Sequence, residues 1–174
     1  MWIQTYSGKK FDFLNPTEAS FDLQDIAHSL SCLCRFNGHT QRFYSVAEHC
    51  VVMSGLVSPE AAQGALMHDA AEAYIGDIST PLKNQAPKLC DLETDILTAI
   101  CARFNINYAT TRGEIKHADL RMLETERLQL MKTQSIENWE CTRGIEPYNV
   151  GLPCWSPYEA CSLFLQRAEM LGIQ

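Results

Sequence analysis

Hydrophobic residues recur along most of the chain at the spacing of amphipathic helices, with polar residues between them. Asp22 can cap a first helix, in which Ile26, Leu30 and Leu33 share one face. A last helix is expected from Ser156, where an N-cap serine, a following proline and a capping-box glutamate coincide. Between these two, the pattern predicts helices near residues 46–57, 59–75, 89–104 and 112–132.

Capping signals place the starts of two of the central helices. Ser45 with Glu48, and Thr111 with Glu114, have the residue types and spacing of a capping box. This predicts that each helix begins at the serine or threonine. It also predicts that the glutamate side chain returns a hydrogen bond to that residue's backbone.

A third central helix is marked at both of its ends. Ser58 is a suitable N-cap with Pro59 at the first helical position, and alanine, leucine and methionine favour helix up to Tyr74. Gly76 is placed to end the helix, since glycine adopts the left-handed conformation without strain. We therefore expect one continuous helix over residues 59–75.

The start of the chain has a different pattern. Two short arms, residues 2–6 and 10–14, flank Ser7-Gly8-Lys9, which predicts a small β-hairpin. No repeat, low-complexity segment or linker divides the chain, so we expect one all-α domain over residues 1–174 with this small N-terminal hairpin. Its expected parts are the hairpin (1–15), a helical core (22–132), a long loop (133–156) and a C-terminal helix (157–172).

Composition narrows the class of protein. With 174 residues, 46% of them hydrophobic, the chain can bury the core of one domain. The net charge of −7 argues against non-specific binding of nucleic acid, which needs a basic surface. No apolar run has the ~20 residues of a membrane span, and the amino terminus lacks the features of a signal peptide. We expect a cytoplasmic protein with a small-molecule partner, and homo-oligomerisation stays open.

The chain contains eight cysteines, most of them in apolar helical contexts and none in a CxxC pair. Without a secretory signal, reduced thiols packed in a cytosolic core are the expected state. Cys141 and Cys154 flank part of the long loop, which leaves open a disulfide or a second metal site there.

Ionisable residues interrupt the apolar helix that precedes Gly76. His68, Asp69 and Glu72 lie within it and Asp77 follows it. Buried charges are costly unless they are paired or bind a metal, and one divalent cation would satisfy all of these groups. His68 and Glu72 are at i, i+4 and share a helical face, with Asp69 one step round. Two ligands from one helix do not hold an ion, so further ligands must come from elsewhere.

Two further candidates lie on neighbouring helices. His49 is in the first turn of the helix that begins at Ser45, on a stretch that faces the core. Asp119 lies among apolar residues of the helix near 112–132, so it is expected to be an inward-facing carboxylate. His117 is two residues away and points to a different side, so the two are not both ligands and His117 is expected to face solvent.

The order of these residues resembles the H…HD…D signature of HD-domain metal-dependent phosphohydrolases. The resemblance covers residues 25–126 and is to a branch common in bacteria and phages. That branch is related to 5′-deoxynucleotidases and, more distantly, to phage dATP triphosphohydrolases. The segments that carry it are Arg35-Phe36-Asn37-Gly38-His39, Glu48-His49, Met67-His68-Asp69-Ala70-Ala71-Glu72, Gly76-Asp77-Ile78-Ser79-Thr80-Pro81-Leu82-Lys83 and Lys116-His117-Ala118-Asp119.

The resemblance implies a mainly helical HD-domain fold and assigns roles to the matching residues. Glu72 would orient or activate the attacking water, and Asp77 would lie near the leaving oxygen. The metal ligands would be His49, His68, Asp69 and Asp119.

Basic residues near the motifs are assigned to the substrate. By the same resemblance Arg35 and Lys83 would face phosphate, and His39, which follows a glycine, is assigned to the substrate pocket. Each has an alternative interpretation. Arg35 could complement a helix dipole, Lys83 could be a surface residue, and His39 could be a loop histidine bonded to backbone.

The chemistry of the four proposed ligands is that of a mixed nitrogen and oxygen site, which suits Mn, Co, Fe or Zn better than Ca, with Mg also a candidate. Such an ion polarises a phosphoryl oxygen and lowers the pKa of bound water. The resemblance implies hydrolysis of deoxynucleoside 5′-monophosphates to deoxynucleoside and phosphate. The alternatives are a dNTP triphosphohydrolase of the dATP type, a non-catalytic nucleotide-sensing or partner-binding module, and a closed structural zinc site.

Overall fold

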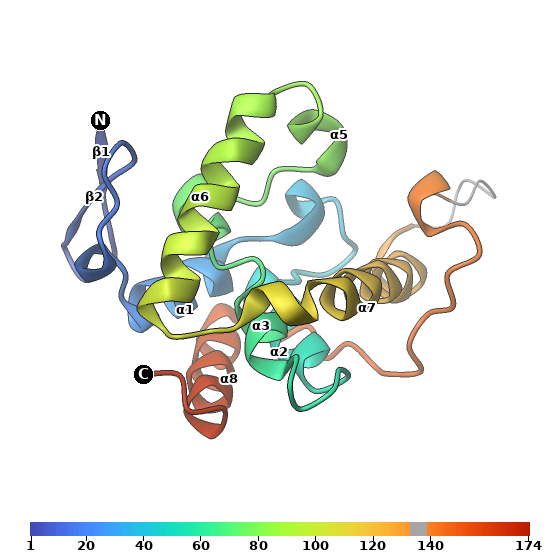
Figure 1. The fold of residues 1–174 in the computed structure, drawn as a ribbon. Helices are drawn as coiled ribbons and strands as arrows, with labels where there is room; N and C mark the ends of the chain where they lie inside the picture. Colours follow the sequence, from blue (N-terminus) through green and yellow to red (C-terminus); the bar gives the residue numbers. More distant parts are fainter. Residues whose placement is uncertain (133–138) are drawn as a thin grey trace.

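The computed structural model describes residues 1–132 and 139–174, which are mainly helical with one small sheet at the amino terminus (Figure 1). This confirms the predicted fold class. Residues 133–138 of the predicted long loop lie outside the described residues. The rest of that loop is irregular apart from one 3-10 turn, η3 (Glu140–Thr142). No helix in the described ranges is both long enough and apolar enough to cross a membrane.

The predicted hairpin consists of strands β1 (Trp2–Gln4) and β2 (Lys10–Asp12), which pair antiparallel with Ile3 opposite Phe11. Phe11 is fully buried, and its ring stacks on Tyr74 with 4.1 Å between the ring centroids. An isolated two-stranded hairpin is marginal in water, so it depends on contacts such as this buried aromatic pair and the hydrogen bonds that the backbone N–H and hydroxyl of Ser7 donate to the carboxylate of Asp25.

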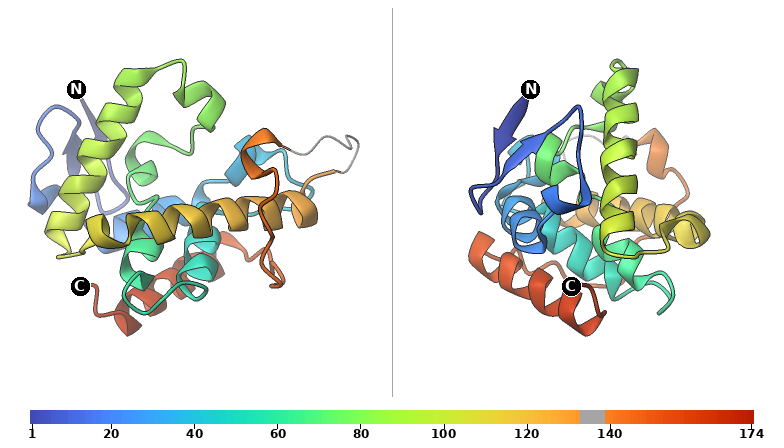
Figure 2. Two further views of the ribbon diagram at one scale, coloured as in Figure 1. Left: turned by 45° about the vertical axis from the view of Figure 1, so that its right-hand side comes forward. Right: turned by 60° about the vertical axis from the view of Figure 1, so that its left-hand side comes forward.

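Three helices form one packed part of the core. They are α1 (Leu23–Cys32), α2 (Val46–Ser54) and α8 (Pro157–Met170), and each packs on the other two (Figures 1 and 2). Asp22 caps α1 by accepting from the N–H of Gln24, and Ser156 caps α8 in a complete capping box, both as predicted. Two 3-10 turns, η1 (Glu18–Ser20) and η2 (Arg35–Gly38), lie on either side of α1.

Of the two capping hydrogen bonds predicted at the start of α2, one is present. The side chain of Ser45 accepts from the N–H of Glu48 at 3.0 Å, so Ser45 is the N-cap. The carboxylate of Glu48 does not return to Ser45. It accepts instead from the backbone N–H groups of Cys154 and Trp155, at 2.7 and 2.6 Å, in the segment that leads into α8. A long-range partner has replaced the local one.

The continuous helix predicted over 59–75 is wrong. The chain forms α3 (Ala62–Met67) and α4 (Glu72–Ile75), joined by a tight turn. In that turn the N–H of Ala70 bonds to the carbonyl of Met67, and the N–H of Glu72 to the carbonyl of Asp69, so the helix narrows to i→i−3 bonding. Gly76 ends α4 at a φ of 85°, as expected of a glycine.

The remaining helices are α5 (Thr80–Lys83), α6 (Pro87–Arg103) and α7 (Tyr108–Leu130). The helix α7 crosses the molecule, and α6 stands at a steep angle to it and carries α5 at its far end (Figure 2). The short helix α5 was not expected as a separate element.

Two of the predicted caps, Thr111 and Ser58, are wrong, and the glutamate of one predicted capping box is instead the partner of the other predicted cap. Thr111 does not begin a helix, because α7 starts earlier, at Tyr108. Ser58 does not cap α3, whose N-cap is Ala61. The carboxylate of Glu114 accepts from the backbone N–H of Ser58 at 2.6 Å and from its hydroxyl at 2.9 Å. The two signals thus serve one contact between the loop before α3 and helix α7.

All eight cysteines are free thiols. Cys141 and Cys154 are therefore not joined, and the disulfide left open for them is not formed. Cys154 adopts a φ of 61° beside the contact with Glu48, which makes it one of the few non-glycine residues with left-handed backbone among the described residues.

Candidate metal centre

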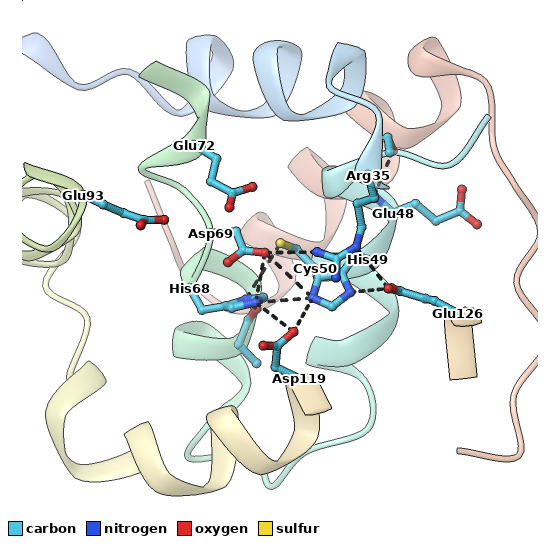
Figure 3. Close-up of polar contacts among 12 residues, drawn as sticks. Arg35, Glu48, His49, Cys50, His68, Asp69, Glu72, Glu93, Asp119 and Glu126 are labelled. Carbon is cyan, nitrogen blue, oxygen red and sulfur yellow. Dashed lines mark hydrogen bonds and ion pairs between the residues drawn. The ribbon is translucent and has the colours of Figure 1, made fainter. Parts of the chain in front are cut away.

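Four side chains from three separate parts of the fold converge on one point (Figure 3). His49 comes from α2, His68 and Asp69 from the turn between α3 and α4, and Asp119 from α7. The Nε2 atom of His49 lies 3.3 Å from Nε2 of His68 and 3.3 Å from Oδ1 of Asp119. Oδ2 of Asp69 lies 3.1 Å from Nε2 of His68 and 3.8 Å from Nε2 of His49. The structure therefore brings together all four residues proposed as ligands.

These distances fit ligands that share a metal ion. Nitrogen and oxygen ligands bind Zn²⁺ at about 2.0–2.2 Å, so two ligands of one tetrahedral ion lie about 3.3–3.6 Å apart. The separations of His49 from His68 and from Asp119 fall at this value, and Nε2 of His68 lies 4.0 Å from Oδ1 of Asp119. His49, His68 and Asp119 thus form one group with ligand spacing, and Asp69 joins it through its contacts with the two imidazoles.

The hydrogen bonds of the two imidazoles give an independent test of the fit. The Nδ1 atom of His49 lies 2.6 Å from a carboxylate oxygen of Glu126, and Nδ1 of His68 lies 2.8 Å from the carbonyl oxygen of Ala65. Both partners accept hydrogen bonds, so each ring carries its proton on Nδ1, and in the neutral rings the Nε2 lone pairs face each other. Two lone pairs at 3.3 Å cannot bond to each other, whereas a cation between them satisfies both.

Local structure explains how two adjacent residues reach the same point. Side chains next to each other on a regular α-helix are about 100° apart. The tight turn after α3 changes this direction, so the side chains of His68 and Asp69 meet with 3.1 Å between Nε2 and Oδ2. Gly64 lets α7 approach α3, because a Cβ atom on it would lie 2.7 Å from Cδ1 of Ile115. That close crossing carries Asp119 to the cluster.

Electrostatics favour ionised carboxylates in the cluster. Burial opposes the charge on Asp69, but His68, His49 and Arg35 outweigh it and hold the pKa of this carboxyl well below its usual range. Burial likewise opposes the charge on Asp119, and the hydrogen bond and charge of His49 still lower its pKa. For His68, burial disfavours the cation, yet Asp69 and Cys50 raise its pKa well above the usual value. The site is thus built to hold positive charge, which a proton or a metal ion can supply.

Glu72 and Asp77 lie beside the cluster and are not among its converging atoms. Glu72 is almost fully buried, with Oε1 3.4 Å from Nζ of Lys83. Its other oxygen, Oε2, is buried and has no hydrogen-bond partner within the described part of the chain. Burial, followed by the charges of Asp69 and Asp77, raises the pKa of Glu72 well above its usual value. Asp77 is half-buried, and its pKa is raised by burial against the pull of Arg35.

The three residues assigned to the substrate lie in different surroundings. Arg35 is buried, with Nε 3.1 Å from Glu126 and Nη1 3.5 Å from Asp69. Lys83 is held between Glu72 and Glu93, and its Nζ lies 2.6 Å from Oε1 of Glu93. His39 is exposed at the end of η2, and no contact of its ring with the cluster is found in residues 1–132 or 139–174. His117 faces solvent, as predicted.

Sequence reasoning missed Glu126, Glu93 and a role for Cys50 beside the cluster. Glu126 is fully buried and bonded to His49, and it lies seven residues after Asp119 on α7. Residues at i and i+7 share a helical face, so this spacing could have identified it. Cys50 is a buried thiol with Sγ 3.9 Å from Nδ1 of His68, and burial raises its pKa to about 11. That nitrogen is already held by a carbonyl, so Cys50 acts as a packed thiol there.

The sequence was compared with family models and with known proteins. No family model matches it. It is 40% identical over 174 residues to the uncharacterized protein YfdR of Escherichia coli (strain K12), with 98% of this chain and 96% of that protein covered. It is also 34% identical over 131 residues to the uncharacterized protein RCAP_rcc00048 of Rhodobacter capsulatus, with 68% of this chain and 67% of that protein covered. The chain therefore belongs to the same protein family as YfdR.

Proposed function

We propose that this protein is a divalent-metal-dependent phosphohydrolase of nucleotides, acting on deoxynucleoside 5′-monophosphates. The observation that carries the proposal is the pair of facing Nε2 atoms of His49 and His68 with the carboxylates of Asp69 and Asp119 around them. Beside this centre lies a buried carboxylate, Glu72, with one oxygen that no side chain or backbone group in the described residues satisfies. Phosphoryl transfer needs mainly such positioned charge, because the protein supplies little covalent chemistry.

The residues fit the metal that the resemblance implies, and different residues would bind the metal, the proton and the substrate. His49, His68 and Asp119 would hold the ion, with Asp69, whose Oδ2 lies 3.1 Å from Nε2 of His68, as the fourth ligand. When bound, a divalent ion there would polarise a phosphoryl oxygen and make a water molecule more acidic. The side chains also exclude bulk water from one side, since His49 is fully buried.

Glu72 is the group best suited to hold or move a proton. Its Oε2 is the unsatisfied buried oxygen, and its raised pKa lets the carboxyl exchange a proton nearer to neutral pH than a free glutamate does. Lys83 lies 3.4 Å from Oε1 and keeps the other end of the carboxyl in place. Asp77 shares the raised pKa, and in this proposal it lies on the side of the leaving oxygen.

The small amount of positive charge near the centre favours a monophosphate over a triphosphate. Arg35 and Lys83 are each already paired with two acidic side chains. A triphosphate carries more negative charge than a monophosphate and would need more unpaired cations beyond the metal. Arg42 is exposed, and its guanidinium lies 3.5 Å from the carbonyl of Leu152.

The test is a substrate screen with defined metals. Protein freed of metal and then loaded with Mn²⁺, Co²⁺, Zn²⁺ or Mg²⁺ is incubated with dAMP and with dATP, and the released phosphate and triphosphate are resolved. We expect phosphate from dAMP. Triphosphate from dATP alone would favour the triphosphohydrolase, and inertness toward both would reject hydrolysis and leave a nucleotide-binding module.

A matched pair of variants separates catalysis from metal binding. Glu72→Gln keeps the shape of the side chain and should lower turnover by roughly 100-fold or more, since general acid–base groups contribute about that much. Its metal content should stay that of the wild type. Glu60→Gln, at an exposed turn position, is the control and should leave both unchanged. A structural zinc site would instead show no turnover in any variant and unfolding on chelation.

A further inference from the structure

Glu126 is a buried carboxylate whose two oxygens have different partners. It lies on α7 and is fully buried. One oxygen, Oε1, lies 2.6 Å from Nδ1 of His49, and the other, Oε2, accepts from Nε of Arg35 at 3.1 Å (Figure 3). A buried charge of this kind persists only where it is paired and hydrogen-bonded, so Glu126 and its two partners depend on one another.

Each of the two partners faces the centre with its other atoms. His49 turns Nε2 toward His68 and Asp119. Arg35 turns Nη1 toward Asp69, at 3.5 Å. Glu126 therefore stands behind both a proposed metal ligand and the cation proposed to face phosphate, and its carboxylate bonds to both of them at once.

We propose that Glu126 is a positioning residue that holds His49 for the metal and Arg35 for the anionic end of the substrate. This inference rests on the proposed function, because it assumes a metal at His49 and a phosphate near Arg35. A carboxylate behind a ligating histidine fixes the ring and its tautomer and strengthens the ligand. A carboxylate on Nε of an arginine holds the plane of the guanidinium, so that its remaining N–H groups keep one direction.

The informative substitution is Glu126→Gln, which keeps the size of the side chain. An amide has one acceptor oxygen and one NH2 group, whereas the carboxylate accepts at both ends. The amide in this variant could accept from His49 or from Arg35, and its NH2 group would then face the other donor. We therefore expect both metal binding at His49 and phosphate binding at Arg35 to weaken in this one variant.

The control is Glu124→Gln on the same helix. Glu124 is also buried, and its carboxylate binds the Arg127 guanidinium at 2.6 and 2.8 Å, away from the cluster. It carries the same change of charge without touching His49 or Arg35. An effect that appears in both variants would come from the net charge of α7 and not from positioning.

The first readout is metal affinity, measured for Mn²⁺ or Zn²⁺ by competition with a chromophoric chelator in the absence of substrate. Loss of a group behind a metal ligand typically costs roughly 10–100-fold in affinity, and we expect Glu126→Gln to fall in this range. The second readout is the binding of inorganic phosphate to the metal-loaded protein by calorimetry, at metal concentrations that saturate each variant. We expect weaker phosphate binding in Glu126→Gln and wild-type values for both readouts in Glu124→Gln.

The Arg35→Lys background separates the effect of Glu126 on metal binding from its effect on phosphate binding. Lysine offers a point charge and no Nε, so it cannot be held in the same way. In this background Glu126→Gln should still weaken metal binding by the same factor, while its effect on phosphate should disappear. If Glu126→Gln weakens phosphate binding equally in the Arg35→Lys background, the effect does not depend on the arginine. That result would overturn the proposal that Glu126 positions Arg35.

The outcomes distinguish this proposal from the proposed function. If the wild type binds no divalent metal, the function itself falls. If the wild type binds metal and hydrolyses dAMP but Glu126→Gln has wild-type affinities, only the role of Glu126 is overturned. Should Glu126→Gln fail to fold, Glu126→Asp replaces it: this side chain keeps the charge but is one methylene shorter, so it cannot span both partners, and the same weakening of one or both affinities is expected.

Discussion

The contact between Glu48 and the segment before α8 gives a sharp prediction about stability. Glu48 is fully buried and accepts from the backbone N–H groups of Cys154 and Trp155, at 2.7 and 2.6 Å. Replacing it by alanine leaves both donors without an acceptor. Each buried donor left unsatisfied costs about 1–3 kcal/mol, so we expect Glu48→Ala to lower the free energy of unfolding by about 2–6 kcal/mol in total.

The matched control is Glu114→Ala. Glu114 also accepts from two donors, the backbone N–H and the hydroxyl of Ser58, but it is exposed, so water can replace it. Its removal should change the free energy of unfolding by no more than about 0.5 kcal/mol, as for most surface substitutions. The comparison therefore isolates burial, because the hydrogen-bond chemistry of the two carboxylates is similar.

Both variants are measured by urea denaturation and by thermal unfolding. For a domain of this size, a loss of about 3 kcal/mol lowers Tm by about 6–12 °C. Equal midpoints for Glu48→Ala and Glu114→Ala would refute the reasoning, since burial would then have no effect. A cost below about 1 kcal/mol for Glu48→Ala would also refute it.

Three further predictions concern the N-cap of α8, the crossing of α3 and α7, and the cluster of proposed metal ligands. Ser156→Ala removes the N-cap of α8 and should lower the free energy of unfolding by about 1 kcal/mol, seen as a shift of the urea midpoint. Gly64→Val should lower the free energy of unfolding by about 1–3 kcal/mol and weaken metal binding, because its Cβ would lie 2.7 Å from Cδ1 of Ile115 where α3 crosses α7. A metal affinity equal to that of the wild type, measured by competition with a chelator, would contradict this prediction. Burial opposes protonation of His68, but Asp69 and Cys50 raise its pKa well above the usual histidine value, so protons should compete with the metal beyond the usual histidine range. The apparent metal Kd should therefore fall as the pH is raised above that range, with proton release seen by calorimetry, and a constant Kd would be inconsistent with this site.

The fold could be predicted from the sequence where local signals had no distant competitor. The caps Asp22 and Ser156 have partners close by along the chain, and both were predicted correctly. Ser58 and Glu114 also carry cap-like patterns, but they bond to each other across the fold. A local pattern cannot reveal such a partner, because the alternative lies far away along the chain.

The candidate site was predictable to a similar extent. The order of His49, His68, Asp69 and Asp119 was enough to expect that they meet, and the structure brings them together. The break after α3 was not predictable, since the segment consists of good helix formers and the tight turn is set by tertiary packing. Glu126 was missed because it belongs to no recognised motif.

The contact of Glu48 with Cys154 and Trp155 also bears on how the protein is made. Domains tend to fold as units while the ribosome extends the chain from the amino terminus. Glu48 is made early, yet its two hydrogen-bond donors follow 106 and 107 residues later, just before the helix α8 that packs on α1 and α2. The contacts that hold Glu48 in place, and with them the native surroundings of the neighbouring His49, can therefore form only after Trp155 has been made.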